Sequence, residues 1–501
     1  MRRGSMLFNS LEFWIFFPIV VGGYFIIPKR IRYIWLLLAS YYFYMNWNAK
    51  YVILLMISTV ITYAGGILIG NTRNENNNWK KGILAGCITG NLFILAIFKY
   101  ADFFIENVNT LMVKAGLQTN IKPLHILLPV GISFYTFQAI GYVIDVYRGE
   151  TEPEKNFLRY ALFVSFFPQL VAGPIERSKN LLNQLKEVPI QKQFDMERIA
   201  RGLILMIYGM FLKMVIADRA AIIPDAVFTD YYVYGAIELI LAVFLFAIQI
   251  YCDFWSYSLM AMGAAKVMGF SLMENFNTPF FANSIRDLWK RWHISLSSWF
   301  RDYLYFPLGG SRCKKIRKYM NLMIVFLVSG LWHGAEWHFI FWGGLLGIFI
   351  IVGDMIAPVK KKLGDLCKVN RECDSYHLLQ MAVTFLLFLI SLIFFRADSV
   401  STAIDIIKKI VFEFNPWILF NGGLYNLGLD RIETHILVVA MTVLFLADLV
   451  RYKKNVLLDE YLMQQNFWFR WLVVILLVCA ILIYGQYGTG FDEQQFIYFQ
   501  F

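Results

Sequence analysis

The run Val328-Ser-Gly-Leu-Trp-His-Gly-Ala335 places the imidazole of His333 inside a stretch that is otherwise apolar enough to cross a membrane. In a bilayer every backbone polar group must be satisfied within the protein, and a helix does this within one segment. An ionisable side chain in such a segment costs free energy and usually marks a function. The run therefore predicts a membrane-helical fold and makes His333 the first candidate functional residue.

The composition extends this prediction to the whole chain. The 501 residues are 58% hydrophobic and 16% charged, whereas a soluble protein is about half apolar and about a quarter charged. Apolar stretches indicate on the order of 11 to 13 membrane segments. They lie at 7–27, 34–46, 51–70, 82–98, 126–145, 157–175, 199–221, 234–269, 319–334, 338–357, 378–396, 434–449 and 468–486. We predict an all-α polytopic bundle around a central tunnel.

Some of these segments are short or interrupted. The stretches 34–46, 319–334 and 338–357 carry glycine, asparagine or paired aromatic residues. Re-entrant backbone is tolerated where it is buried in protein or lines a wet cavity. We therefore expect some of the segments to be re-entrant.

The charged residues are concentrated in particular loops. The net charge is +11, but the basic residues lie in short loops such as 312–318, 360–368 and 451–454, as expected of cytosolic loops in a membrane protein. Segments 222–238 and 411–434 are poor in lysine and arginine and are expected to face outward. We therefore expect a multi-pass protein of the bacterial cytoplasmic membrane. Its partner is expected to be the lipid bilayer, and no nucleic-acid binding is expected.

The chain shows no internal repeat and no soluble linker. The six cysteines are scattered, without the paired spacing of a metal site. We expect one membrane domain over 1–501, with the motifs that carry chemistry at about 250–345 and no appended soluble enzyme.

A basic, tryptophan-rich segment precedes the His333 run. Residues 286–301 mix arginine and lysine with tryptophan, which suits a helix at the membrane boundary. In one continuous helix, His293 and Ser297 would share a face, with Trp289 one turn earlier. On spacing alone, His293 is equally well explained as a functional residue or as a hydrogen-bonded part of an interfacial anchor.

The depth of His333 follows from helix geometry. It lies 15 residues after Lys318, which is roughly 22 Å of rise in a helix and past the middle of a ~30 Å hydrocarbon core. The ring would be reached only through a tunnel. A neutral buried imidazole beside a hydroxyl is a good general base. The alternative is a structural histidine that donates to a backbone carbonyl.

Other chemistries find less support. His333, Glu336 and His338 follow the order His-x-x-Glu-x-His, which differs from a zinc-binding His-Glu-x-x-His helix and directs the two rings to different faces. We therefore predict no metal.

Asp253 and Gln138 are polar groups near membrane depth, as is Glu176. Each alone is best explained structurally, while together they suggest a polar-lined cavity.

Two long motifs resemble a known family. They are Trp289-Lys-Arg-Trp-His-Ile-Ser-Leu-Ser-Ser-Trp-Phe-Arg-Asp-Tyr-Leu-Tyr-Phe-Pro-Leu-Gly-Gly310 and Gly330-Leu-Trp-His-Gly-Ala335. They look like the membrane-bound O-acyltransferases, within the bacterial branch of alginate and peptidoglycan O-acetyltransferases and D-alanyl transfer proteins. The chain length and the tail Phe496-Ile-Tyr-Phe-Gln-Phe501 resemble the alginate type most.

The resemblance implies roles for particular residues. His333 matches the family's essential buried histidine and His293 the second histidine near the substrate tunnel. We hypothesise that His333 activates the acceptor hydroxyl and that His293 binds or polarises the thioester. The residues expected along the tunnel or at the donor are Trp289, Ser297, Arg301, Asp302, Tyr303, Trp332, Asp253 and Gln138. Arg301 or the cluster 312–318 would hold donor phosphates.

The resemblance also implies the substrates. The donor would be acetyl coenzyme A or an acyl carrier protein thioester, with no tightly bound cofactor. The acceptor would be a cell-envelope polysaccharide, reached through an extracytoplasmic partner with a serine-hydrolase-like domain. Acetyl transfer is favoured, D-alanyl transfer to teichoic acid is the alternative, and a transporter without covalent chemistry is a third possibility. A transporter would be expected to show inverted halves, which the sequence lacks.

Overall fold

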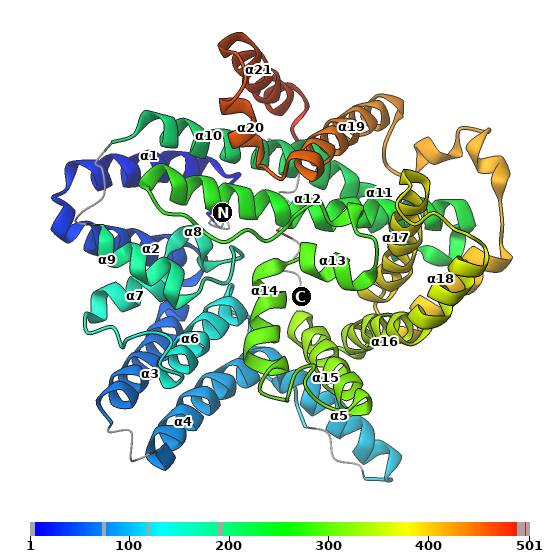
Figure 1. Cartoon of the computed structure of the whole chain (residues 1–501). Coiled ribbons are helices and arrows are strands. Elements are labelled where there is room, and N and C mark those ends of the chain that lie inside the picture. The colour runs from blue at the N-terminus through cyan, green and yellow to red at the C-terminus, as the bar shows by residue number, and fades with distance from the viewer. Residues whose placement is uncertain (1–5, 73–76, 118–120, 189–193, 488–495, 497–501) are drawn as a thin grey trace. The chain divides into compact units, whose positions relative to one another are not determined.

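The computed structural model describes residues 6–72, 77–117, 121–188, 194–487 and 496, and all regular elements in this part are helical (Figure 1). The predicted all-α class is confirmed. Of the tail motif 496–501, only Phe496 lies within the described residues.

The α-helices differ widely in length, from four residues to 33. They are α1 Leu11–Ile26, α2 Arg32–Asn48, α3 Val52–Asn71, α4 Asn77–Leu95, α5 Ala101–Lys114, α6 Ile132–Tyr147, α7 Phe157–Ser165, α8 Phe167–Leu170, α9 Asn183–Glu187, α10 Met196–Phe211, α11 Asp218–Thr229, α12 Ala236–Met268, α13 Ile285–Arg291, α14 Ile294–Phe300, α15 Lys315–His333, α16 Trp337–Leu366, α17 Asp374–Arg396, α18 Val400–Phe412, α19 Arg431–Lys454, α20 Leu458–Met463 and α21 Phe467–Tyr484. Wider π-helical turns continue some of them, including Leu212–Ala217 after α10 and Arg301–Tyr305 after α14.

Eight helical stretches within the described residues are long and apolar enough to cross a membrane. They are Lys29–Asn71, Asn77–Lys114, Met196–Thr229, Ala236–Met268, Trp337–Leu366, Asp374–Arg396, Arg431–Lys454 and Phe467–Tyr484, and α1 is a shorter apolar helix. The protein is thus a polytopic membrane protein.

Five of the thirteen expected stretches do not add a crossing of their own. Segments 7–27 and 319–334 form α1 and α15, which are not among the eight. Segments 126–145 and 157–175 form α6 and α7, which have only 16 and 9 residues. Segments 34–46 and 51–70 belong to one helical stretch of 43 residues. Segment 338–357, considered as re-entrant, lies inside α16, whose 30 residues are enough to cross.

The chain forms two compact units. The first comprises Met1–Met206 with Tyr257–Met273, and the second Ile207–Ser256 with Glu274–Phe501. In the first unit α3 packs against α4, α6 and α7. In the second, α16 packs between α15 and α17, and α13 packs on α16 and α17. The expected single domain over 1–501 stays a prediction.

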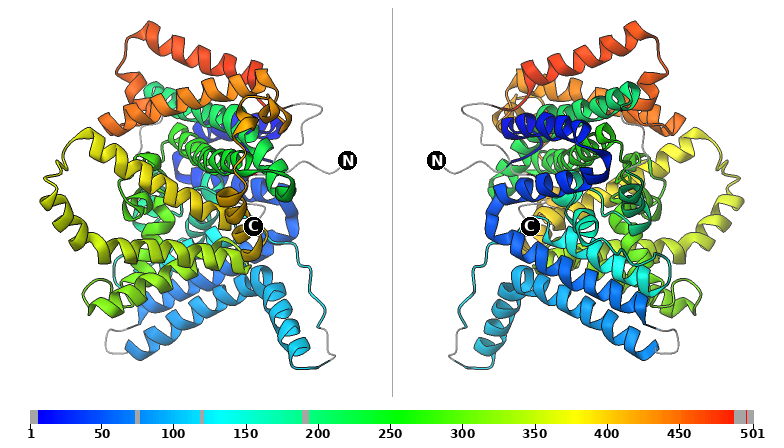
Figure 2. Two further views of the ribbon diagram at one scale, coloured as in Figure 1. Left: turned by 90° about the vertical axis from the view of Figure 1, so that its right-hand side faces the viewer. Right: turned by 90° about the vertical axis from the view of Figure 1, so that its left-hand side faces the viewer.

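The α15–α16 hairpin depends on glycine. A methyl group on Gly330 of α15 would overlap the carbonyl oxygen of Phe339, and one on Gly343 of α16 would overlap that of Phe326. Small residues of this kind let two helix backbones approach closely. Figures 1 and 2 show α15 and α16 side by side as a result. The hairpin holds His333, the last residue of α15, against α16.

The predicted continuous helix over 286–301 is wrong, because the chain breaks between α13 and α14. Trp292 is extended and His293 takes a left-handed backbone conformation, with φ of +44°. Asn275, from outside the segment, anchors the start of α14: its carbonyl accepts from the Ile294 N–H at 2.8 Å, and its side chain accepts from the Ser295 hydroxyl at 2.6 Å. These bonds stabilise the new helix start.

Candidate active site

Two buried histidines both contact one tryptophan. The ring centroid of Trp332 is 5.8 Å from that of His293 and 4.9 Å from that of His333. His293 is 0% exposed and His333 is 4% exposed. The break between α13 and α14 supplies one ring and the end of α15 supplies the other, so two separate motifs meet in one cluster.

Aromatic side chains enclose both imidazoles. His333 meets Trp342 of α16 edge-on at 5.0 Å and Phe395 of α17 at 5.5 Å, and these two rings lie 4.9 Å apart. His293 meets Phe254 of α12 edge-on at 4.5 Å. Such surroundings exclude water and strengthen every polar interaction made inside them.

Trp289 belongs to the same wall. Its ring lies 5.9 Å from Trp342 and 5.6 Å from Phe326. The buried indole N–H groups of Trp289 and Trp342 make no hydrogen bond within the described part of the chain. Buried donors normally have partners, so these two N–H groups are available to a substrate oxygen.

The environment fixes the charge of His293. Burial lowers the pKa of this imidazole well below its ordinary value of 6.5, and the nearby His333 lowers it further, because protons on both rings would repel each other. The ring is therefore neutral at neutral pH. A neutral imidazole carries one donor and one acceptor nitrogen, which suits it to polarise a carbonyl group.

This pKa shift predicts how stability depends on pH. Below about 6.5 the unfolded chain binds a proton at His293 that the folded state does not, so the free energy of unfolding falls as pH decreases. The melting temperature of the purified protein should drop between pH 7.5 and 5.5. Asparagine tolerates the left-handed backbone and does not titrate, so His293→Asn should show a smaller drop. Equal drops in the two proteins would contradict the shift.

Four of the other residues predicted along the tunnel, Ser297, Arg301, Asp302 and Tyr303, lie on α14 and the turn after it. The Ser297 hydroxyl donates to the Trp292 carbonyl at 3.2 Å, and the Tyr303 ring lies tilted against that of Trp299, with ring centroids 5.1 Å apart. Arg301 pairs with Asp302 at 2.8 Å, and its side chain is 57% exposed. The structure thus places Arg301 at the surface, with its charge already paired.

Asp253 lies in a separate ionic cluster. Its carboxylate is 2.6 Å from the ammonium of Lys213, which is also 2.8 Å from Asp218, and all three side chains are buried. A buried cation between two carboxylates satisfies charges that would otherwise be very unfavourable in a membrane. Its chain neighbour Phe254 contacts His293 of the histidine cluster.

Gln138 and Glu176 belong to the first compact unit. Gln138 donates to the Phe163 carbonyl at 2.5 Å and accepts from Gln169 at 3.1 Å. The Glu176 carboxylate accepts from the Met273 N–H at 2.5 Å, and burial raises its pKa to about 7. Each has its own structural partners, and the polar-lined cavity expected from them stays a prediction.

His338 has partners of its own as well. Its Nδ1 lies 3.0 Å from the Phe394 carbonyl and its Nε2 lies 3.1 Å from the Glu336 carboxylate. Within the described ranges, no three His, Cys, Asp or Glu side chains form a group that could hold a metal ion.

Sequence reasoning missed three residues of the cluster, which are Trp342, Phe395 and Phe254. Trp342 precedes the glycine pair Gly343 and Gly344, a local signal of close helix packing that was available. The other two have no local signal, because they come from helices distant in the sequence. Only the packing of α12 and α17 brings them to the histidines.

Comparison with known proteins identifies the family of the chain. The model of the MBOAT, or membrane-bound O-acyltransferase, family matches residues 154–365. The chain belongs to the membrane-bound O-acyltransferase family. It is therefore an O-acyltransferase, a multi-pass enzyme of the cell membrane.

Individual members of the family differ in how much of this chain they match. A protein named as a probable alginate O-acetylase in Pseudomonas syringae is 36% identical over 447 residues, covering 88% of this chain and 81% of the relative. A peptidoglycan O-acetyltransferase of Helicobacter pylori is 35% identical over 441 residues, covering 82% and 81%. A teichoic acid D-alanyltransferase of Bacillus subtilis is 27% identical over 243 residues, covering 45% and 59%. The alginate and peptidoglycan relatives match over more of the chain and at higher identity.

Proposed function

We propose that the protein transfers an acetyl group from a cytosolic thioester donor to a hydroxyl group outside the membrane. The acceptor is a cell-envelope polysaccharide, or a partner protein with a serine-hydrolase-like domain that passes the group on. The relatives named for alginate and peptidoglycan acetylation support this substrate class. The observation that carries the proposal is the buried cluster of His293, Trp332 and His333.

The chemistry needs one base and one carbonyl-polarising group. His333 takes the proton of the acceptor hydroxyl while that oxygen attacks the thioester carbonyl. The new C–O bond forms, the C–S bond breaks, and the leaving thiolate takes up the proton. Neutral His293 donates a hydrogen bond to the carbonyl oxygen, where negative charge develops. Trp289, Trp332 and Tyr303 line the route, and the dry aromatic wall limits hydrolysis of the thioester.

The proposed direction of transfer rests on how the helices run. Asp354 of α16 pairs with Lys318 at 2.8 Å and with Arg286 at 2.7 Å, which ties α13 to the basic ends of α15 and α16. His333 lies at the other end of α15, roughly 22 Å away by helical rise. With the basic ends in the cytosol, a donor from that side and an acceptor from the opposite side meet at this histidine.

Contacts at the opposite end fit the same orientation. The Asn415 side chain accepts from the Ile237 N–H at 3.0 Å and donates to Glu238 at 2.6 Å. These bonds join the two segments that are poor in lysine and arginine, 222–238 and 411–434. Both segments would then lie on the outer side, where the acceptor and the partner are found.

D-alanyl transfer to teichoic acid is the second candidate, because D-alanyltransferases match about half of the chain. The two candidates differ in donor. Coenzyme A carrying labelled acetyl and a carrier protein carrying labelled D-alanine should each be offered to the purified full-length protein in vesicles, with an oligosaccharide acceptor present.

We expect thiol release from acetyl coenzyme A together with O-acetylation of the acceptor, both lost in His333→Gln. Activity with the D-alanyl carrier protein alone would select the second candidate. Movement of a solute across the vesicle membrane without thioester cleavage, unchanged in His333→Gln, would instead support a transporter and refute the proposal.

A further inference from the structure

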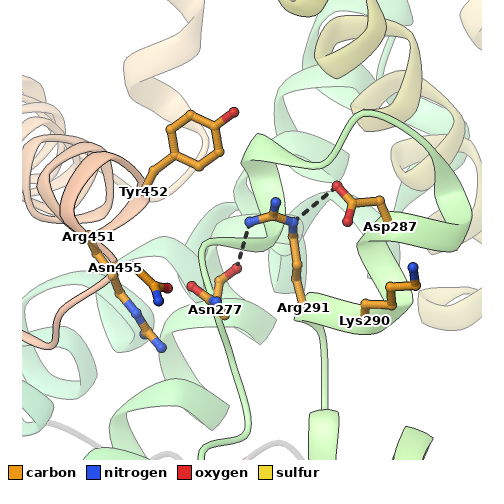
Figure 3. A pocket seen from close by; sticks show the side chains of 7 residues that line it. All are labelled: Asn277, Asp287, Lys290, Arg291, Arg451, Tyr452 and Asn455. Atoms are coloured by element: carbon orange, nitrogen blue, oxygen red, sulfur yellow. Dashed lines mark hydrogen bonds and ion pairs between the residues drawn. The ribbon is translucent and has the colours of Figure 1, made fainter.

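A polar pocket of about 380 Å³ lies between α13 and the end of α19. Figure 3 shows its lining, which comes from two distant parts of the chain. The lining residues are Asn277, Asp287, Lys290, Arg291, Arg451, Tyr452 and Asn455. Three cations face one carboxylate, so the pocket has an excess of positive charge.

Arg451 is fixed in place. It is 7% exposed, and its Nη2 donates to the Glu274 carboxylate at 2.5 Å and to the Phe276 carbonyl at 2.6 Å. Its guanidinium stacks over Trp255 at 4.9 Å. Its buried Nη1 has no hydrogen-bond partner among the described residues. A buried guanidinium with one nitrogen left over is a preorganised donor for an anion.

Arg291 is also held, from the other side of the pocket. Its Nε donates to Asp287 at 3.1 Å, and its Nη1 lies 3.4 Å from the Asn277 carbonyl, as the dashed lines in Figure 3 mark. Its guanidinium faces the Tyr452 ring at 5.7 Å. Lys290 is exposed and makes no ion pair within the part of the chain that the structure describes. The pocket therefore combines two oriented guanidinium groups with one ammonium that can move toward a ligand.

The pocket adjoins the histidine cluster along the chain. Arg291 is separated from His293 only by Trp292, and two consecutive peptide units span at most about 7.6 Å. Arg286, at the start of the same helix α13, pairs with Asp354 beside Lys318. The pocket thus lies on the helix that connects the basic helix ends to the candidate catalytic residues.

We propose that this pocket binds a phosphate group of the acyl donor. The group is the phosphate ester that precedes the pantetheine arm, which coenzyme A and acyl carrier proteins share. This inference rests on the proposed function and adds the donor-binding site to it. The expectation that Arg301 or the cluster 312–318 holds donor phosphates stays a separate prediction. The Arg301 side chain is 57% exposed, whereas Arg451 is 7% exposed and fixed in place.

The test is equilibrium binding of labelled acetyl coenzyme A to the full-length protein in a His333→Ala background, so that turnover does not interfere. Lys290→Gln and Arg291→Gln should each weaken binding roughly tenfold or more, because each removes a charge-assisted contact. Lys453→Gln is the matched control, since Lys453 is exposed on the same end of α19 and does not line the pocket. It should bind within twofold of the parent.

A second ligand tests the phosphate itself. Acetyl pantetheine, which lacks the phosphate, should bind equally to the parent and to Lys290→Gln. Equal loss of affinity for both ligands would overturn the inference. So would unchanged affinity for acetyl coenzyme A together with unchanged affinity for an acyl carrier protein. Because Lys290 is exposed, we expect this variant to fold normally, and a single symmetrical peak in size-exclusion chromatography checks that.

Two further binding measurements identify the source of the phosphate. Loss of affinity for an acyl carrier protein but not for coenzyme A would assign the phosphate to the carrier protein. The other possible source of the phosphate is a lipid headgroup. It is tested by repeating the binding measurement in lipid nanodiscs with and without phosphatidylglycerol. If the variants alter only the response to this anionic lipid and leave donor binding unchanged, the donor assignment is wrong. A parent protein that binds neither donor would contradict the proposed function itself.

Discussion

His333→Ala is expected to lower acyl transfer by a factor of about 10² to 10⁴, the range typical of losing a general base. The ring is enclosed by Trp332, Trp342 and Phe395, so no solvent base can replace it. The loss should fall on kcat, with the KM for the donor changed little, because the base acts in the transition state. Initial rates of thiol release over a range of donor concentrations measure both constants.

An exposed histidine provides the matched control for His333. His435 lies on the surface of α19, and His435→Ala should keep acyl transfer within twofold of wild type. If a folded His333→Ala protein retains transfer within tenfold of wild type, His333 is not the base. In that case the structural alternative, a histidine that only holds α15 in place, would be correct.

Gly343→Ala is expected to have an effect of similar size through packing alone. The added methyl group would overlap the Phe326 carbonyl oxygen and approach the Gly330 backbone at 3.1 Å. Backbone atoms cannot move aside as a flexible side chain can, so α15 and α16 must separate. Overpacking of this kind typically destabilises a protein by about 1–3 kcal/mol. Because Trp342 and His333 lie on the two helices of this hairpin, we expect transfer to fall at least about 100-fold.

Gly353→Ala in the same helix separates packing from helix propensity. A methyl group on Gly353 meets nothing within 4 Å, and alanine favours a helix over glycine. This variant should be as active as wild type and no less stable. Melting temperatures and transfer rates of both variants in the same detergent measure the difference. Equal behaviour of the two alanines would show that close approach at Gly343 is not required.

The sequence predicted those features that depend on local patterns. Apolar length predicted an all-helical membrane protein, and the spacing from Lys318 predicted that His333 lies far along a helix, as α15 shows. Hydrophobic length alone overestimated the number of crossings, because α6 and α7 are apolar but short.

Features that depend on distant residues were not predictable in this way. Helical spacing put His293 in a continuous helix, but hydrogen bonds that Asn275 accepts from Ile294 and Ser295 stabilise a new helix start at Ile294. Arg451 likewise looked like one of several cytosolic topology charges, and only the fold brings it to the pocket beside Arg291. In both cases the deciding partner lies outside the motif.

The left-handed backbone at His293 limits how this enzyme can be redesigned. Among residues other than glycine, asparagine, aspartate and histidine are the ones enriched in that conformation, and histidine alone of these has an aromatic ring. Asparagine would satisfy the backbone but lose the contact with Phe254, whereas phenylalanine would keep a ring and strain the backbone. Directed evolution toward other acyl groups would therefore have to keep position 293 fixed and reshape the side chains around it, with Phe254 and Trp332 as the first to vary.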